Sequence, residues 1–174
     1  IGGHTYNAYK PKIIFRSFYR LFKTFYPLKF IQDLDIKITK KIFLNKLNVE
    51  IIYWRNHAYF HDKNTNDLLK NNGFELVSNI VDLQYYIPKK KNNLVLLPIN
   101  TFPDHEYLDH STDHSSNWTL DHWYKANLIQ INKILSKKGL ATLLTHPLCI
   151  YLEDNFNSFD EFVSKVNKMK SKYT

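Results

Sequence analysis

The sequence predicts an α/β fold in which β–α units surround a mainly parallel sheet. Short apolar runs alternate with longer runs whose apolar positions recur every three or four residues, a pattern typical of strands that alternate with helices. Polar or ionisable residues directly follow the predicted strands, where parallel folds carry their functional groups. Because the 174 residues contain no internal repeat and no linker-like stretch, we expect one domain with one core.

The first half of the chain shows the clearest helical periodicity. Apolar side chains such as Ile31, Leu34 and Ile38 recur at helical steps. Gly73 is expected to end the next helix. The expected elements, in order, are a strand over residues 1–4, a basic and aromatic helical or mixed segment over 10–26, a helix over 30–47, a strand over 49–54, a helix over 65–72 and a strand over 75–81.

The second half continues the alternation of strands and helices. Gly139 is expected to end a long helix, and Ser158 followed three residues later by Glu161 predicts a capping box at the start of the last one. The expected elements, in order, are a strand over residues 94–98, a polar loop rich in His and Asp over 100–118, a helix over 120–135, a buried strand over 140–145 and a helix over 158–169.

Charge and cysteine content limit the function classes. The net charge is +8, but the lysines are scattered, with one short run at residues 89–91 and no recognised nucleic-acid module, so we expect no nucleic-acid partner. A single cysteine, Cys149, excludes a disulfide framework and a Cys-rich zinc site and favours a cytoplasmic over a secreted location. No apolar run approaches the ~20 residues that span a bilayer, so no transmembrane segment is expected. The sequence leaves the oligomeric state open.

Four segments, most of them at predicted strand ends, carry a family resemblance. They are Gly2-Gly3-His4-Thr5, Trp54-Arg55-Asn56-His57-Ala58-Tyr59, the acidic and Trp-containing stretch 104–123, and Leu143-Leu144-Thr145-His146-Pro147. Their ordered set resembles the motifs of the polysaccharide deacetylase (NodB-homology) family. The resemblance implies an incomplete (β/α) barrel of the polysaccharide deacetylase type that lacks its N-terminal strands. Residues 1–174 would then be the C-terminal part of a single deacetylase-like domain.

The resemblance also implies a reaction and residue roles. Family members are hydrolases in which a divalent metal, commonly zinc, activates water to remove the N-acetyl group from a sugar of a polysaccharide or glycolipid precursor. Carried over, His4 is a metal ligand, Arg55 orients the catalytic base, and His146 is the general acid toward the leaving amine. Asp104 is the candidate for the acidic residue of the fourth motif. Leu143 would form part of the wall around the acetyl methyl group.

The sequence departs from the family pattern at several positions. No Asp-Asp pair precedes His4, so we expect the chain to begin after the family's first motif. Ala8 stands where the second metal-binding histidine belongs, and alanine cannot ligate a metal. His57, where the family often has proline, is a candidate replacement ligand or substrate contact. Tyr59 and Trp118 are further candidates for contact with the sugar.

Other interpretations remain open at this stage. Ala8 favours a non-catalytic, carbohydrate-binding relative, and the positive charge allows a partner with an anionic surface. Arg55 after a buried strand could instead form a structural ion pair. The three Asp-His pairs within residues 104–114 resemble metal ligands, although a loop that covers the substrate explains them as well.

Overall fold

The computed structural model describes residues 3–4, 29–56, 59, 61–108 and 118–173. The expected helical segment at 10–26 lies outside these residues. The chain divides into two compact units, which we describe separately. Unit 1 comprises residues 1–80 and 89–97, and unit 2 comprises residues 81–88 and 98–174.

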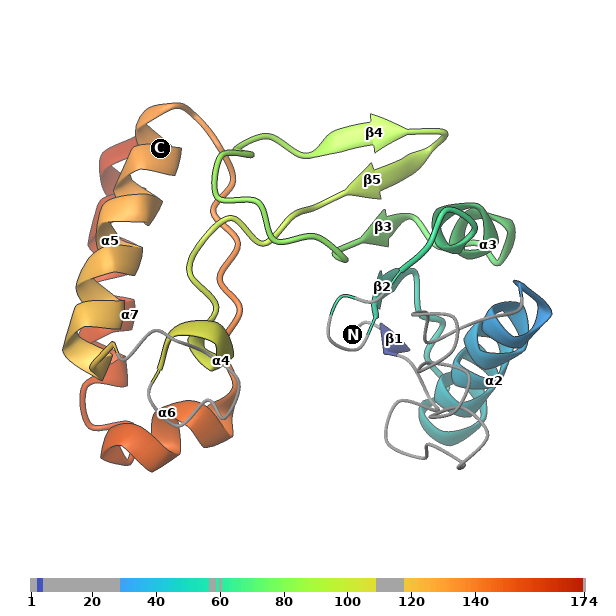
Figure 1. Ribbon diagram of the computed structural model, residues 1–174, viewed down its shortest axis with the longest axis horizontal. Coiled ribbons are helices and arrows are strands. Elements are labelled where there is room, and N and C mark those ends of the chain that lie inside the picture. The colour runs from blue at the N-terminus through green and yellow to red at the C-terminus, as the bar shows by residue number, and fades with distance from the viewer. Residues whose placement is uncertain (1–2, 5–28, 57–58, 60, 109–117, 174) are drawn as a thin grey trace, which may run out of the picture. The chain divides into compact units, whose positions relative to one another are not determined.

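Unit 1 is built on a five-stranded sheet with the order β1-β2-β3-β5-β4 (Figure 1). The first four strands in this order are parallel, and β4 pairs with β5 in the antiparallel sense. This arrangement confirms the expected α/β class with a mainly parallel sheet. The strands are β1 (Gly3–His4), β2 (Tyr53–Arg55), β3 (Leu76–Val77), β4 (Lys89–Lys91) and β5 (Leu94–Leu96).

Two helices supply the apolar partners of this sheet. They are α2 (Lys29–Leu47) and α3 (Thr65–Asn71), which confirm the helices expected from periodicity. The buried core joins Ile36 of α2 and Leu69 of α3 to Trp54 of β2, and the rings of Trp54 and Phe74 meet edge to face at 5.1 Å. Gly73 has a φ of 79° directly after α3, a conformation in which an L side chain is strained.

The strand β4 was not expected, because three consecutive lysines suggest a solvated charge run rather than a strand. Asn92 and Asn93 link it to β5, and both adopt positive φ values of 51° and 65°. Two central residues with positive φ are typical of the tight turns that join antiparallel strands. The register pairs Lys91 with Leu94, so the turn contains two residues.

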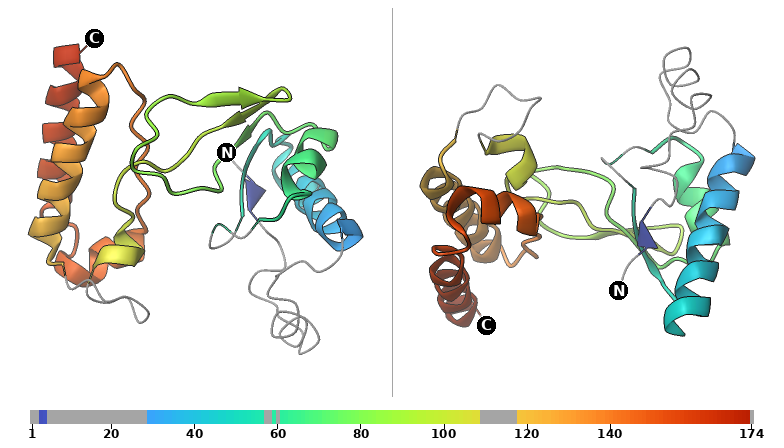
Figure 2. Two further views of the ribbon diagram at one scale, coloured as in Figure 1. Left: turned by 45° about the horizontal axis from the view of Figure 1, so that its top comes forward. Right: turned by 90° about the horizontal axis from the view of Figure 1, so that it is seen from below.

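Unit 2 is mainly helical in its described part. Its helices are α4 (Asp104–Tyr107), α5 (Leu120–Ser136), α6 (Pro147–Asp154) and α7 (Phe159–Tyr173). Figures 1 and 2 both show α7 alongside α5, and Trp123 and Phe162 are buried where these helices pack. The hydroxyl of Thr119 caps α5 by accepting a hydrogen bond from the His122 amide at 3.2 Å. Among the described helices of both units, none has the length and apolarity needed to cross a membrane.

The expected strand at residues 140–145 is wrong, because this segment has no regular strand pairing. The buried side chain of Asn100 contacts it instead. Its Nδ2 donates to the Leu140 carbonyl at 2.9 Å, and its Oδ1 accepts from the Thr142 amide at 2.9 Å. One side-chain amide thus replaces the backbone ladder that the apolar sequence suggested.

The two expected helix-end signals of unit 2 also need correction. After α5 the left-handed residue is Lys138, with a φ of 56°, rather than Gly139. Gly139 is required for space, because an added Cβ would lie 2.7 Å from the Tyr86 carbonyl oxygen. At the start of α7, the amide of Ser158 donates to Asp154 and Glu161 pairs with Lys165, so both capping-box residues have other partners.

Candidate functional site

The candidate site of unit 2 centres on Asp104, the first residue of α4. Two contacts from α5 fix the chain just before it. Oδ1 of the Asn127 side chain accepts from the Phe102 amide at 2.9 Å, and the indole of Trp123 donates to the Phe102 carbonyl at 2.8 Å. Asn127 and Trp123 are fully buried, so α5 holds Asp104 in a defined position.

The second anchor of the site is the segment that leads to His146. Thr142 is bonded on both sides: its hydroxyl donates to the Pro98 carbonyl, and its own carbonyl accepts from the Thr101 hydroxyl at 2.9 Å. Pro147, in the first turn of α6, has the fixed φ that suits a helix start. His146 therefore sits at a defined junction between an anchored segment and a helix.

Asp104 and His146 are directly bonded. Asp104 Oδ1 lies 2.8 Å from His146 Nδ1, and Oδ2 accepts from the His146 amide and from the Thr145 hydroxyl, the latter at 3.0 Å. Oδ1 also accepts from the His105 amide at 2.7 Å. The Asp104 side chain is fully buried, whereas that of His146 is 48% exposed.

The electrostatics of Asp104 favour its ionised form. Burial by itself raises the pKa of this carboxyl, but the hydrogen bonds from His105 and His146 outweigh it and hold the pKa well below its usual range. An ionised carboxylate only accepts hydrogen bonds, so Nδ1 of His146 carries a proton. Nε2 is then the nitrogen that exchanges a proton, and the pair can act as a general acid or base.

Trp118 belongs to an aromatic cluster of unit 2. Trp118 stacks on His122 with ring centres 4.4 Å apart and contacts Phe102 and Tyr107 at 5.2 and 4.7 Å. Leu143 is half-buried against the same apolar cluster. Trp118 and Leu143, two of the residues predicted to contact the substrate, therefore belong to the packed part of unit 2.

The remaining predicted residues belong to unit 1. His4 ends β1 and is in register with Arg55, which ends β2. Arg55 donates to the Ser78 hydroxyl at 3.1 Å, and burial lowers the pKa of its guanidinium. Tyr59 adopts a positive φ of 59°. Ala8 and His57 lie outside the described residues.

Cys149 adds a third potential ligand to the site in unit 2. The ligand atoms of Asp104, His146 and Cys149 all lie within 4.8 Å of one another, which makes them a possible metal-binding group. However, burial and the nearby Asp104 carboxylate raise the pKa of the Cys149 thiol to about 11, whereas metals bind the thiolate. Asp104 and His146 also use their facing atoms to bond each other. This donor set fits a hydrogen-bonded acid–base pair better than a metal centre.

Two further residues belong to this site: His105, which was expected only as part of an Asp-His pair that resembles metal ligands, and Thr145, which had no predicted role. His105 lies edge to face with His146, with ring centres 4.9 Å apart, and its adjacency to Asp104 was the available signal. Thr145 lies within the quoted Leu143–Pro147 motif, but a hydroxyl bond across 41 positions has no local sequence signature.

The comparisons with known proteins support the fold. No protein-family model and no curated protein matches the sequence. The structure is similar to the crystal structure of a protein from Mycobacterium smegmatis that is provisionally named a polysaccharide deacetylase, with a TM-score of 0.64 and 16% sequence identity. The match covers 80% of this chain and 51% of that one, so the chain spans about half the length of that protein. At this identity the likeness shows a shared fold.

Proposed function

We propose that this protein is a metal-dependent hydrolase that removes an N-acetyl group from a sugar of a polysaccharide or glycolipid precursor. The observation that carries the proposal is the bond between buried Asp104 and half-exposed His146. Amide hydrolysis needs a proton on the leaving nitrogen, and an imidazole held by a carboxylate is suited to deliver it. The likeness in fold to a protein named a deacetylase supports the same reaction.

The proposed reaction is hydrolysis of the bond between the acetyl carbon and the sugar nitrogen. With both ring nitrogens of His146 protonated, water oxygen bonds to the acetyl carbon, the carbon–nitrogen bond breaks, and Nε2 gives its proton to the nitrogen, which leaves as the free amine. One proton of the water passes to the catalytic base and from there restores Nε2, and the other is lost from the acetic acid product to solvent, so that acetate is the second product. Asp104 is a positioning residue, because it holds Nδ1 of the imidazole. Arg55 is proposed to orient the base, and Leu143 to bound the acetyl methyl group. Tyr59, His57 and Trp118 are proposed as sugar contacts.

The proposed metal is a divalent cation, with zinc as the first candidate. Bound metal would polarise the acetyl carbonyl and activate water. His4 is the proposed ligand of this chain, and Ala8 offers none. Zinc sites that catalyse hydrolysis use about three protein ligands, so His4 needs further ligands to hold the metal.

The proposal also covers domain organisation. We infer that residues 1–174 are the C-terminal part of a single deacetylase-like domain of the incomplete-barrel type. The order of β–α units in unit 1 and the 51% coverage of the structural neighbour support this inference.

A second function is favoured by one observation. Ala8 replaces a proposed metal ligand, which suits a carbohydrate-binding relative without catalysis. Both the hydrolase and the non-catalytic protein would bind an N-acetylated carbohydrate, but the hydrolase alone would release acetate from it.

The test is to measure acetate release from an N-acetylated oligosaccharide by the metal-free protein, before and after addition of Zn²⁺. We expect release that requires Zn²⁺ and falls about 10²- to 10⁴-fold in the His146→Gln variant. His61→Gln, at an exposed histidine of unit 1, is the matched control and should keep full activity. Binding of the oligosaccharide without acetate release would instead establish the non-catalytic function.

A further inference from the structure

A polar pocket lies wholly within unit 1, between α3 and the β4–β5 hairpin. Its cavity volume is about 220 Å³, comparable to the volume of one sugar unit. Polar side chains surround it, and Leu94 and Leu96 of β5 form its apolar part. The polar residues are Lys63, Asn66, Asp67, Lys70, Lys91 and Asn92.

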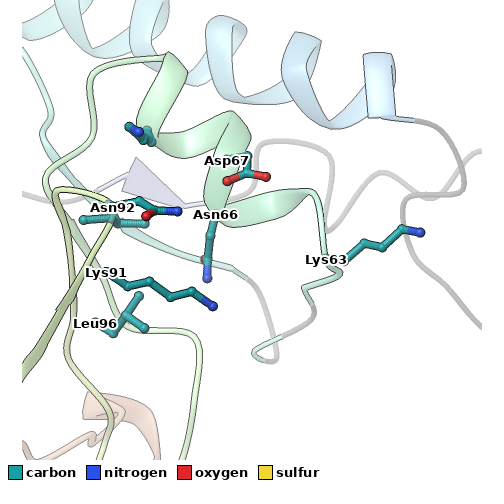
Figure 3. Close-up of a pocket in the computed structure, with 8 residues that line it drawn as sticks. Lys63, Asn66, Asp67, Lys91, Asn92 and Leu96 are labelled. Carbon is teal, nitrogen blue, oxygen red and sulfur yellow. The ribbon is translucent and has the colours of Figure 1, made fainter.

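The local fold explains why these residues meet. Leu68 and Leu69 of α3 are buried in the core, so the opposite face of the helix presents Asn66, Asp67 and Lys70 to the pocket. The tight turn at Asn92 places Lys91, the last residue of β4, across from this face. In Figure 3 the side chains of Asn66 and Lys91 point toward one another, whereas that of Lys63 points outward.

The pocket carries an excess of positive charge. Three lysines line it, Lys63, Lys70 and Lys91, against one acidic residue, Asp67. Within the described part of the chain, no salt bridge joins any of these lysines to an acidic side chain. An anionic group in the pocket would therefore gain attraction without the loss of an existing ion pair.

The pocket also contains an unused hydrogen-bond acceptor. Oδ1 of Asn66 is buried and has no hydrogen-bond partner among the described residues. Such an acceptor costs free energy unless a donor reaches it, so a turn of the Asn66 amide that brings Oδ1 to the pocket surface is favoured when a hydroxyl group is bound there. The pocket thus combines cationic groups, an acceptor for a hydroxyl and an apolar surface.

We propose that this pocket binds a sugar unit that bears a carboxylate or phosphate group. Lys91 and Lys70 contact the anionic oxygens, Asn66 accepts a hydrogen bond from a ring hydroxyl, and Leu96 contacts the apolar face of the sugar. Asp67 accepts from a second hydroxyl and disfavours ligands with additional negative charge. Binding in this pocket involves no chemical step, so it is independent of the acetyl hydrolysis proposed above.

The experiment is to titrate the 174-residue chain by NMR with anionic sugars and with their separate halves. Glucuronate and glucose 6-phosphate are the ligands, and glucose, acetate and inorganic phosphate are the halves. We expect at least one anionic sugar to bind roughly fivefold or more tightly than glucose and than its own free anion. Equal affinity for the free anion would reduce the pocket to a simple ion site and overturn the proposal, as would equal affinity for glucose or no binding at all.

Single substitutions test whether the anionic sugar binds in this pocket. Lys91→Gln should weaken binding of the anionic sugar roughly fivefold. Lys90→Gln is the control, because it makes the same charge change on the same strand. Successive side chains of a strand point to opposite faces, so Lys90 points away from the pocket. The affinity of the Lys90→Gln variant for the anionic sugar should match that of the unaltered protein. Asp67→Asn should tighten binding. If Lys91→Gln and Lys90→Gln weaken it equally, only net charge matters and the assigned pocket is wrong.

Discussion

Asp104 and His146 lie 42 positions apart in the sequence, yet Oδ1 of the first and Nδ1 of the second are separated by 2.8 Å. Four donors converge on this one buried carboxylate, from the His105 amide, the Thr145 hydroxyl, and the amide and ring of His146. Asp104 therefore joins α4 to the start of α6 and orients the imidazole at the same time. Its removal should affect stability, acid sensitivity and the reactivity of its neighbours.

The first prediction concerns stability and pH. Asp104→Asn should lower the free energy of unfolding by about 2 to 3 kcal/mol at pH 7, because an amide cannot accept hydrogen bonds at both positions. The pKa of Asp104 is depressed in the folded protein, so its contribution is present above about pH 4. It declines as the pH falls, by up to about 1.4 kcal/mol per pH unit, since the unfolded chain binds the proton first.

Urea denaturation at pH 7, 4 and 3 measures this effect. The stability of the Asp104→Asn variant should depend less on pH than that of the unaltered protein. Asp160→Asn, at an exposed position of α7, is the control. If the free energy of unfolding changed with pH to the same extent in Asp104→Asn and in the unaltered protein, the depressed pKa of Asp104 would be contradicted.

The second prediction concerns Cys149. With a thiol pKa of about 11, only about one thiol in a thousand is ionised at pH 8, so alkylation by iodoacetamide should be slow and should accelerate up to about pH 11. Replacing Asp104 by Asn removes the nearby negative charge and should speed the reaction at pH 8. Mass spectrometry of the alkylated chain gives the rates of alkylation. Rapid alkylation of the unaltered protein at neutral pH would disprove the raised pKa of the Cys149 thiol.

The third prediction concerns Asn100. Its replacement by alanine leaves the Leu140 carbonyl, the Thr142 amide and the Tyr85 carbonyl without this partner. We expect a loss of about 2 to 4 kcal/mol in the free energy of unfolding. Urea denaturation followed by tryptophan fluorescence, to which buried Trp123 contributes, measures this loss. Asn167→Ala, at an exposed position of α7, should change stability by less than about 0.5 kcal/mol.

The fourth prediction separates two adjacent residues at the end of α5. Gly139→Ala should destabilise the protein by about 1 to 3 kcal/mol, because the new methyl group meets Tyr86 and Ile134 at 2.7 to 2.8 Å. Lys138→Gly should be neutral or stabilising by up to about 1 kcal/mol, because Lys138 occupies the left-handed region. Thermal unfolding compares the two variants, and the opposite order of stability would show that Gly139 is not required for space and that Lys138 is not strained.

The helices and the fold class were predictable because their signals are local. Leu68, Leu69 and Gly73 encode the length and the end of α3 within a few positions, and periodicity alone identified α2 and α5. The strands β2 and β3 were expected at the right places but are shorter than expected, since apolar composition does not show how many residues find a pairing partner.

The missed features depend on contacts between distant residues. An apolar run at 140–145 resembles a strand, and nothing nearby reveals that Asn100 supplies its hydrogen bonds. The helix α6 was missed because Pro147 and its neighbours have a weak helical pattern. Of the candidate site, Asp104 and His146 were both named, but their direct bond could not be read from residues 42 positions apart.

The lysines of β4 have a further consequence for association between copies of the protein. β4 is an outer strand of the described sheet, and outer strands are where sheets of two chains can pair. Lys89, Lys90 and Lys91 are all exposed on it, and a second copy added edge to edge would bring like charges together. This repulsion opposes polymerisation through the sheet at low ionic strength. Concentrated salt shortens its range to about 3 Å, so light scattering should show self-association first under those conditions.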